Sequence, residues 1–191
     1  MLTWPAMNRC PWLPPGLELY QDYHDHEWGV PSRDRRHLFE MICLEGAQAG
    51  LSWWTILQKR EHYRKVFRNF EPEALLRMHV SRFEKLVADP GIVRHRGKIF
   101  GVRQNARAWL ELEEREGSAV DWIWSFVDDE PIVNRWQRMK DYPSQTGESV
   151  KLSKAMKKAG FTFFGPTIAY AFMQAVGMVD DHSADCFRSR Q

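Results

Sequence analysis

The apolar positions of the chain recur mostly at helical spacing. Leu38, Met41 and Ile42 form one apolar stripe, and a second stripe runs from Trp53 to Val66. The same spacing predicts further helices over residues 73–78, 80–88, 99–110, 120–127, 132–139, 149–159 and 168–176. No stretch of convincing length alternates apolar and polar residues, as a half-buried strand would. We therefore expect an all-α fold.

Capping residues and glycines predict where the central helices begin and end. Ser32 or Asp34 can cap the helix that carries the first stripe, because short polar side chains accept hydrogen bonds from free amides. Gly46 or Gly50 should end this helix. Ser52 can cap the following helix, so a tight turn joins the two.

The rest of the chain predicts one compact unit. Residues 10–16 contain three prolines and should form a loop, because proline interrupts both helices and central strands. No linker-like or repetitive stretch divides the chain. We expect a single domain over residues 1–191, with residues 1–7 as a ragged end.

An acidic residue interrupts the first apolar stripe. Glu45 follows Met41 and Ile42 by three or four positions and so lies on the same helical face. An unpaired carboxylate on a buried face is costly. Glu45 is therefore either a structural residue, paired with an arginine of a neighbouring helix, or a functional carboxylate at a binding site.

Composition and charge narrow the classes of protein only slightly. The 191 residues carry a formal net charge of +2, so a basic surface would have to come from local clustering. Three widely separated cysteines do not form a disulfide framework, which favours a reducing, cytoplasmic location. No apolar run is long enough to span a membrane, and the first residues lack a signal-peptide pattern.

A basic, glycine-bounded segment lies between two of the predicted helices. Gly91 and Gly97 bracket a cluster in the hairpin Pro90–Lys98. The basic side chains of this hairpin are Arg94, His95, Arg96 and Lys98. Backbone amides and basic side chains together suit phosphates without reading bases, although a merely solvated basic loop would have the same composition.

Two groups of residues could hold ligands. His182 and Cys186 are four positions apart, a spacing used in zinc sites, and Cys10 and His24 could complete a tetrahedral set of two cysteines and two histidines. The alternative is four unrelated residues. Separately, Tyr23, Trp28 and Trp53 could converge with Glu45 on one cavity, and aromatic faces with one carboxylate suit a flat cation.

Four runs of this sequence carry a resemblance to a known family. They are residues 23–31, 38–53, 91–99 and 161–181. At these residues, and over roughly Asn8 to Cys186, the chain resembles the 3-methyladenine DNA glycosylase I family, constitutive bacterial enzymes of the helix-hairpin-helix glycosylase superfamily. The resemblance implies a helix-hairpin-helix DNA glycosylase fold in which the predicted hairpin contacts DNA.

The resemblance also implies roles for individual residues. It implies one structural Zn2+, which ties the two ends of the chain together through Cys10, His24, His182 and Cys186. It implies a base pocket formed by Glu45, Tyr23, Trp12, Trp28 and Trp53, in which Glu45 is the catalytic carboxylate. It implies DNA contacts from Gln48 and Leu51, which would fill the gap left in the duplex, and from Arg94, Arg96, Gly97 and Lys98.

The implied activity is excision of N3-methylated adenine from double-stranded alkylated DNA by a monomeric, monofunctional glycosylase. Methylation makes the base cationic and a good leaving group, so electrostatics and positioning can suffice. Accordingly, no carboxylate follows the hairpin between Ile99 and Arg107. Two alternatives are a non-catalytic sensor of DNA damage and a zinc hydrolase, which would need an open coordination position.

Overall fold

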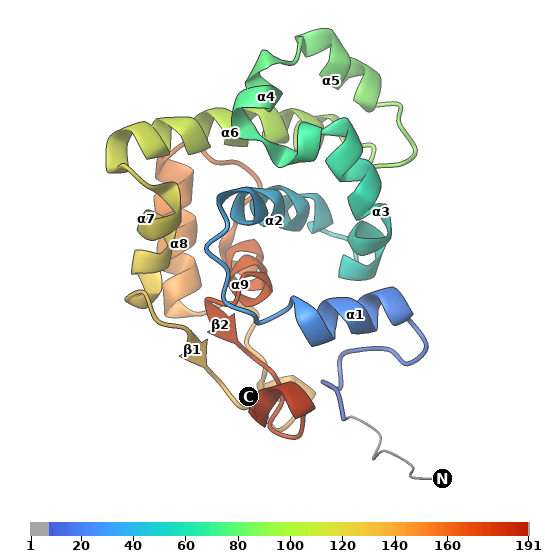
Figure 1. Ribbon diagram of the computed structural model, residues 1–191, viewed down its shortest axis with the longest axis vertical. Coiled ribbons are helices and arrows are strands. Elements are labelled where there is room, and N and C mark those ends of the chain that lie inside the picture. The colour runs from blue at the N-terminus through green and yellow to red at the C-terminus, as the bar shows by residue number, and fades with distance from the viewer. Residues whose placement is uncertain (1–7, 191) are drawn as a thin grey trace.

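The computed structural model describes residues 8–190, so the predicted ragged end at residues 1–7 lies outside the described residues. The described part is mostly helical, as predicted (Figure 1). Its helices are α1 (Glu18–His26), α2 (Arg35–Gln48), α3 (Trp53–Val66), α4 (Pro72–Arg77), α5 (Val80–Leu86), α6 (Arg96–Glu116), α7 (Ala119–Trp124), α8 (Gly147–Lys158) and α9 (Pro166–Ala175). Short 3-10 turns are η1 (Arg68–Phe70), η2 (Ser125–Val127), η3 (Met139–Asp141) and η4 (Phe187–Arg190).

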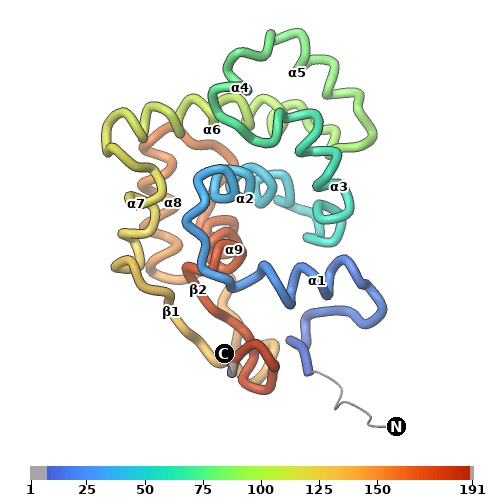
Figure 2. Tube along the Cα trace, viewed as in Figure 1, coloured from blue at the N-terminus to red at the C-terminus, as the bar shows by residue number. Residues whose placement is uncertain are grey.

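Helix α2 is the centre of the molecule. Every residue from Leu38 to Ala47 is buried, because α3, α6 and α9 pack around this helix (Figures 1 and 2). Of the two predicted caps, Asp34 is the one used, and its carboxylate accepts a hydrogen bond from the amide of His37 at 2.6 Å. The helix continues through Gly46 and ends at Gln48.

The remaining helices cover this centre from two sides. Helices α4 and α5 pack on α6 at one end, and α8 packs on α9 beside α7 (Figure 1). Helix α6 begins at Arg96, earlier than the predicted Ile99, because the ring of His95 caps it by accepting from the amide of Lys98 at 3.1 Å. Residues 87–95 therefore form the connection between α5 and α6.

The prediction of a helix over residues 132–139 is wrong, and two strands of two residues each accompany the helices. Residues Ile132–Val133 form β1, which pairs in parallel with β2 (Val179–Asp180). Beyond β1, the buried carboxylate of Asp181 accepts from the side chains of Asn134 and Trp136, both at 2.8 Å. These contacts with the C-terminal segment satisfy polar groups that a helix would have had to satisfy internally.

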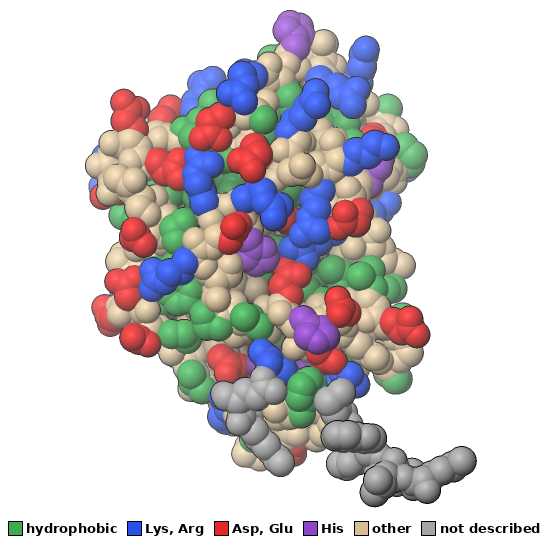
Figure 3. All heavy atoms as spheres, viewed as in Figure 1, with side chains coloured by type: hydrophobic (Ala, Val, Ile, Leu, Met, Phe, Trp, Pro, Cys, Tyr) green, Lys and Arg blue, Asp and Glu red, His purple; other side chains and the backbone are tan. Residues whose placement is uncertain are grey.

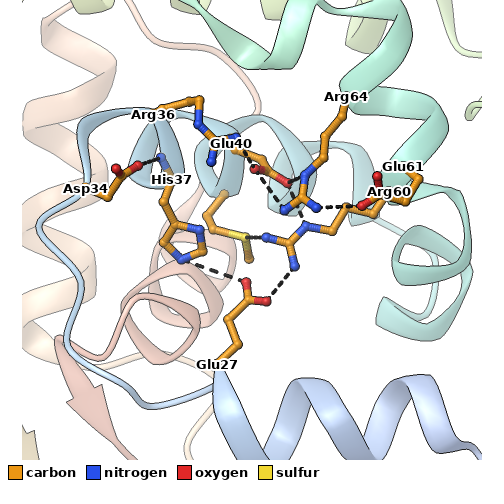
Figure 4. Close-up of polar contacts among 9 residues, drawn as sticks. Glu27, Asp34, Arg36, His37, Glu40, Arg60, Glu61 and Arg64 are labelled. Atoms are coloured by element: carbon orange, nitrogen blue, oxygen red, sulfur yellow. Dashed lines mark hydrogen bonds and ion pairs between the residues drawn. The ribbon is translucent and has the colours of Figure 1, made fainter.

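A buried ion cluster joins α2, α3 and the end of α1 (Figure 4). Arg60 on α3 is buried although it is charged, and only 5% of it is exposed. Its Nε donates to Glu40 Oε1 at 2.6 Å and its Nη1 donates to Glu27 Oε2 at 2.7 Å. Burial opposes ionisation of Glu40, but Arg60 and Arg64 outweigh burial and hold its pKa below the ordinary value. Helix α2 therefore buries two carboxyl groups, those of Glu40 and Glu45, and the ion pair belongs to Glu40.

The surface mixes charges of both signs. On the face shown in Figure 3, Lys and Arg side chains lie among Asp and Glu side chains, and they are more frequent over the end formed by α4, α5 and α6. This distribution agrees with a formal net charge of only +2. Within residues 8–190, no helix combines the length and the apolar character needed to cross a membrane.

We predict that Arg60→Leu lowers the free energy of unfolding by about 3–5 kcal/mol, because it leaves the buried carboxylate of Glu40 without its principal partner. Urea denaturation measures this loss. The matched control is Arg115→Leu, which removes an exposed pair with Glu116 and should cost no more than about 1 kcal/mol. Equal losses in the two variants would show that the buried pair adds nothing to stability.

Candidate active site

A cavity of about 340 Å³ opens where α1, α2 and α3 meet. Its lining comes from segments far apart in the sequence: Trp12, Tyr20, Tyr23, Trp28, Glu45, Gln48, Trp53, Met139, Tyr142, Pro143, Ala171 and Gln174. All five residues assigned to the base pocket are among them. The volume lies within the range typical of sites for small organic ligands. A more open depression of about 650 Å³ beside α4 and α5 has a basic lining without a carboxylate.

Aromatic rings form most of the inner surface of this cavity. The centroids of Trp12 and Trp28 lie 4.8 Å apart in an edge-on arrangement, and those of Tyr23 and Trp53 lie 5.3 Å apart. Trp53 is the first residue of α3. Its position is fixed because Ser52 caps this helix by accepting a hydrogen bond from the amide of Thr55 at 3.2 Å. The rings thus hold one another in place and present flat faces to a ligand.

Glu45 lies in the last turn of α2 and is 3% exposed. Its side chain forms no ion pair or hydrogen bond with the described residues, so the structural alternative of an arginine partner does not hold. Burial raises the pKa of Glu45 to about 8, and the charge of Arg60 lowers it only in part. In the empty cavity the carboxyl group therefore keeps its proton near neutral pH, and a cationic ligand would favour its ionised form.

Four buried polar atoms of residues that line the cavity lack hydrogen-bond partners among the described residues. They are Oε2 of Glu45, the indole nitrogens of Trp12 and Trp53, and the hydroxyl of Tyr142. Buried polar groups in proteins are nearly always paired, so each exception calls for an explanation. A ligand that both donates and accepts hydrogen bonds in this cavity would satisfy them.

The residues expected to contact DNA lie at the cavity edge, on the α5–α6 connection and in the first turn of α6. Gln48 lines the cavity, and Leu51 is 43% exposed in the turn before α3. Arg94 and Gly97 are exposed, and Arg96 pairs with Glu84 on α5. Lys98 forms a hydrogen bond within the protein, in which its Nζ donates to the carbonyl oxygen of Ala47 at 2.9 Å. This contact fixes α6 against the end of α2.

Three of the four predicted metal ligands come together. One ligand atom each of Cys10, His24 and Cys186 lies within 4.8 Å of the others, and all three residues are buried. Asp25 accepts a hydrogen bond from Nδ1 of His24 at 2.8 Å, so the lone pair of this ring lies on Nε2. Nε2 faces Sγ of Cys186 at 3.6 Å and accepts a long hydrogen bond from the amide of Cys10 at 3.4 Å, so it points into the ligand group. This donor set of two thiols and an imidazole has the chemistry that zinc prefers.

His182 lies beside this group rather than within it. Its ring centroid is 5.1 Å from that of His24, and its Nδ1 is held by Asp180 at 2.7 Å. Its Nε2 is buried and has no hydrogen-bond partner among residues 8–190. The carboxylate contact on Nδ1 and the unpaired Nε2 repeat the arrangement of a metal-binding histidine.

Comparison with known proteins shows the family to which this chain belongs. Residues 12–189 match the family described as methyladenine glycosylase. The chain belongs to the methyladenine glycosylase family. It is 51% identical over 180 residues to DNA-3-methyladenine glycosylase 1 of Escherichia coli (strain K12), with 94% of this chain and 96% of that relative covered.

Solved structures extend the similarity to the fold of the methyladenine glycosylases. A crystal structure of 3-methyladenine DNA glycosylase I has a TM-score of 0.91 and 50% identity, covering 94% of this chain and 98% of that chain. A variant of 3-methyladenine DNA glycosylase I in complex with 3-methyladenine has a TM-score of 0.90 and 36% identity, covering 97% and 98%. The arrangement of helices described above is therefore that of the family.

Sequence reasoning missed part of the lining of the cavity. The cavity is lined by Met139, the last residue of the segment that was predicted as a helix, and by Tyr142 and Pro143 just beyond that segment. Tyr20 and Gln174 also contribute, from α1 and α9. Tyr20 lies three residues before Tyr23 and so shares its helical face. This spacing could have predicted that Tyr20 also lines the cavity. No local pattern places the other residues beside Glu45, because the contacts of the C-terminal segment bring them there.

We predict that rising pH destabilises the parent relative to Glu45→Gln. The free energy of unfolding of the variant minus that of the parent should therefore increase with pH. The unfolded carboxyl ionises near 4.5, whereas the folded one keeps its proton to about pH 8. Between these values the folded state binds one more proton, so the stability of the parent falls with rising pH, by about 1.4 kcal/mol per pH unit. Denaturant unfolding of both proteins at about pH 5 and about pH 8.5 measures the effect. A difference that does not change with pH would mean that Glu45 ionises normally.

Proposed function

We propose that this protein excises 3-methyladenine from double-stranded alkylated DNA as a monofunctional glycosylase in base excision repair. The observation that carries the proposal is the aromatic cavity with one buried, unpaired carboxyl group. Such a cavity gains most from a flat ligand that carries positive charge and amino hydrogens. An adenine methylated at N3 is such a ligand, and unmodified adenine lacks the charge.

The chemistry places modest demands on the protein. The bond between the deoxyribose C1′ and the base nitrogen breaks, its electron pair leaves with the cationic base and neutralises it, and a water oxygen bonds to C1′ with release of a proton. In our proposal Glu45 accepts hydrogen bonds from the base and offsets its charge, while Tyr23, Trp12, Trp28 and Trp53 hold the ring. Positioning and electrostatics then account for the acceleration.

A base inside a duplex cannot reach a cavity of this kind, so the nucleotide must be flipped out. We assign Gln48 and Leu51 to the gap that the flipped base leaves, because an exposed leucine at the cavity edge can fill an apolar space between base pairs. Arg94, Arg96, Gly97 and Lys98, on the α5–α6 connection and the start of α6, would then form a helix-hairpin-helix contact with phosphates. In that role Lys98 also keeps the connection fixed to α2.

We further propose one structural Zn2+ bound by Cys10, His24, Cys186 and His182. The support is the donor set, the carboxylates on both histidines and the unpaired Nε2 of His182. When bound, the ion would cross-link residues near the two chain ends and add its binding free energy to folding. Because all cavity residues belong to one chain, the proposed working form is a monomer, and the free thiols suit a reducing cytoplasm.

We predict that Glu45→Gln slows single-turnover excision of 3-methyladenine at saturating enzyme, because it keeps the shape of the side chain and removes its charge. Affinity for undamaged duplex should not change. Chromatography of the bases released from methylated DNA measures the rate. If the parent binds the damaged duplex but releases no base, the protein is a damage sensor. If parent and variant release it equally fast, Glu45 has only a structural role.

We also predict one zinc per chain by elemental analysis of undenatured protein. Cys186→Ser should lose this zinc and lower the melting temperature, because a structural ion contributes directly to folding. Cys43→Ser is the matched control, since Cys43 is a buried free thiol outside the ligand group. Zinc-free parent protein, or equal zinc content in the two variants, would contradict the assignment.

A further inference from the structure

An exposed phenylalanine lies in a strained position beside the α5–α6 connection. Phe163 is 39% exposed and has a φ of +55°, in the left-handed region. Bulky side chains rarely adopt this conformation, which is unfavourable and persists only where surrounding contacts impose it. Neither the cavity nor the proposed zinc group uses this residue.

Three glycines form a seat for Phe163. A Cβ added at Gly46 on α2 would lie 3.1 Å from the carbonyl oxygen of Phe163. At Gly97 and Gly101 on α6, it would lie 3.3 Å and 3.0 Å from the ring. Side chains at these positions would therefore push Phe163 away from the two helices. Phe163 therefore packs against both α6 and the end of α2, and the chain continues from α2 into the exposed turn at Leu51.

Side chains of α6 hold the loop that carries Phe163. Asn105 accepts from the amide of Thr162 at 2.8 Å and donates to its carbonyl oxygen at 3.3 Å. Gln104 donates to the carbonyl oxygen of Gly160 at 3.2 Å. These contacts fix the loop just before the strained residue. Just after it, the carbonyl oxygen of Phe164 accepts from Oγ of Ser153 on α8 at 2.7 Å, so the exposed ring has a defined position.

A basic cleft of about 330 Å³ lies next to this ring. Its lining includes Phe100, Arg103, Gln104, Arg107 and Phe163. Nε of Arg103 is buried and has no hydrogen-bond partner among the described residues. Neither Arg103 nor Arg107 forms an ion pair with any residue that the structure describes. Two unpaired guanidinium groups therefore lie beside an exposed aromatic face.

We propose that this cleft binds a second nucleotide of the DNA, next to the gap at Leu51. Its phosphate would contact Arg103 and Arg107, and its base would stack on Phe163. Guanidinium groups recognise phosphate oxygens, and aromatic side chains bind unstacked bases without regard to sequence. The cleft lies along α6, which directly follows the α5–α6 connection, so one DNA backbone can contact both. This inference rests on the proposed glycosylase function.

Two variants test the proposal. Phe163→Asn removes the ring and keeps a residue that tolerates the left-handed conformation, whereas Arg103→Gln leaves the seat of Phe163 untouched. Each should weaken binding to lesion-containing duplex at least about fivefold, with kcat/KM for excision falling in parallel. Arg103→Gln should also reduce the salt slope of binding by about one. Arg115→Gln, at the far end of α6, is the matched control and should leave both quantities unchanged.

Binding of free 3-methyladenine separates this cleft from the base cavity. Both variants should bind the free base as tightly as the parent does, and Arg103→Gln should keep the parent's melting temperature. Parent-like DNA affinity in both variants would overturn the proposal while leaving the glycosylase function in place. A loss of affinity for DNA and free base alike would also overturn it, because the residues would then act through the cavity. A parent that releases no base would instead refute the glycosylase function.

Discussion

The ion pair between Arg60 and Glu40 holds together the helices that surround the cavity. Arg60 belongs to α3 and Glu40 to α2, and the second contact of Arg60 reaches Glu27 just beyond α1. These are the helices that carry Trp53, Glu45 and Tyr23. Because a buried guanidinium with two carboxylate partners has a fixed geometry, it also fixes the spacing of the rings and of the carboxyl group in the cavity.

The same pair explains why Glu45 differs from Glu40 although both are buried on α2. Arg60 satisfies Glu40 directly and influences Glu45 only through its charge, so Glu40 has a lowered pKa and Glu45 a raised one. The protein thus keeps one buried carboxyl group without a partner. In our interpretation, the missing partner is the positive charge of the methylated base, which would lower the cost of ionising Glu45 only when the correct base is present.

The C-terminal segment closes the cavity from the other side. The carboxylate of Asp181 accepts from Asn134, Trp136, Tyr170 and Gln174, and it thereby ties the segment after β1 to α9. Residues 139–143 then lie over the cavity. The neighbouring group of Cys10, His24 and Cys186 brings residues near both chain ends to the same side. A disturbance near the termini should therefore be transmitted to the cavity through residues that do not touch a ligand.

The sequence by itself determined the helical class, most helix positions and the place of Glu45 on a buried helical face, because helical periodicity, capping residues and glycines are local properties. It also suggested that Tyr23, Trp28 and Trp53 share a cavity with Glu45, and the resemblance to a family added Trp12. Tertiary structure alone decided that residues 132–139 are not helical, since their partners lie near residues 178–184. It also decided that Arg60 is buried, that Glu40 rather than Glu45 receives its ion pair, and that Phe163 is held against three glycines. Each of these outcomes depends on which distant residue satisfies a polar group or leaves room for a ring, and periodicity carries no information about distant partners.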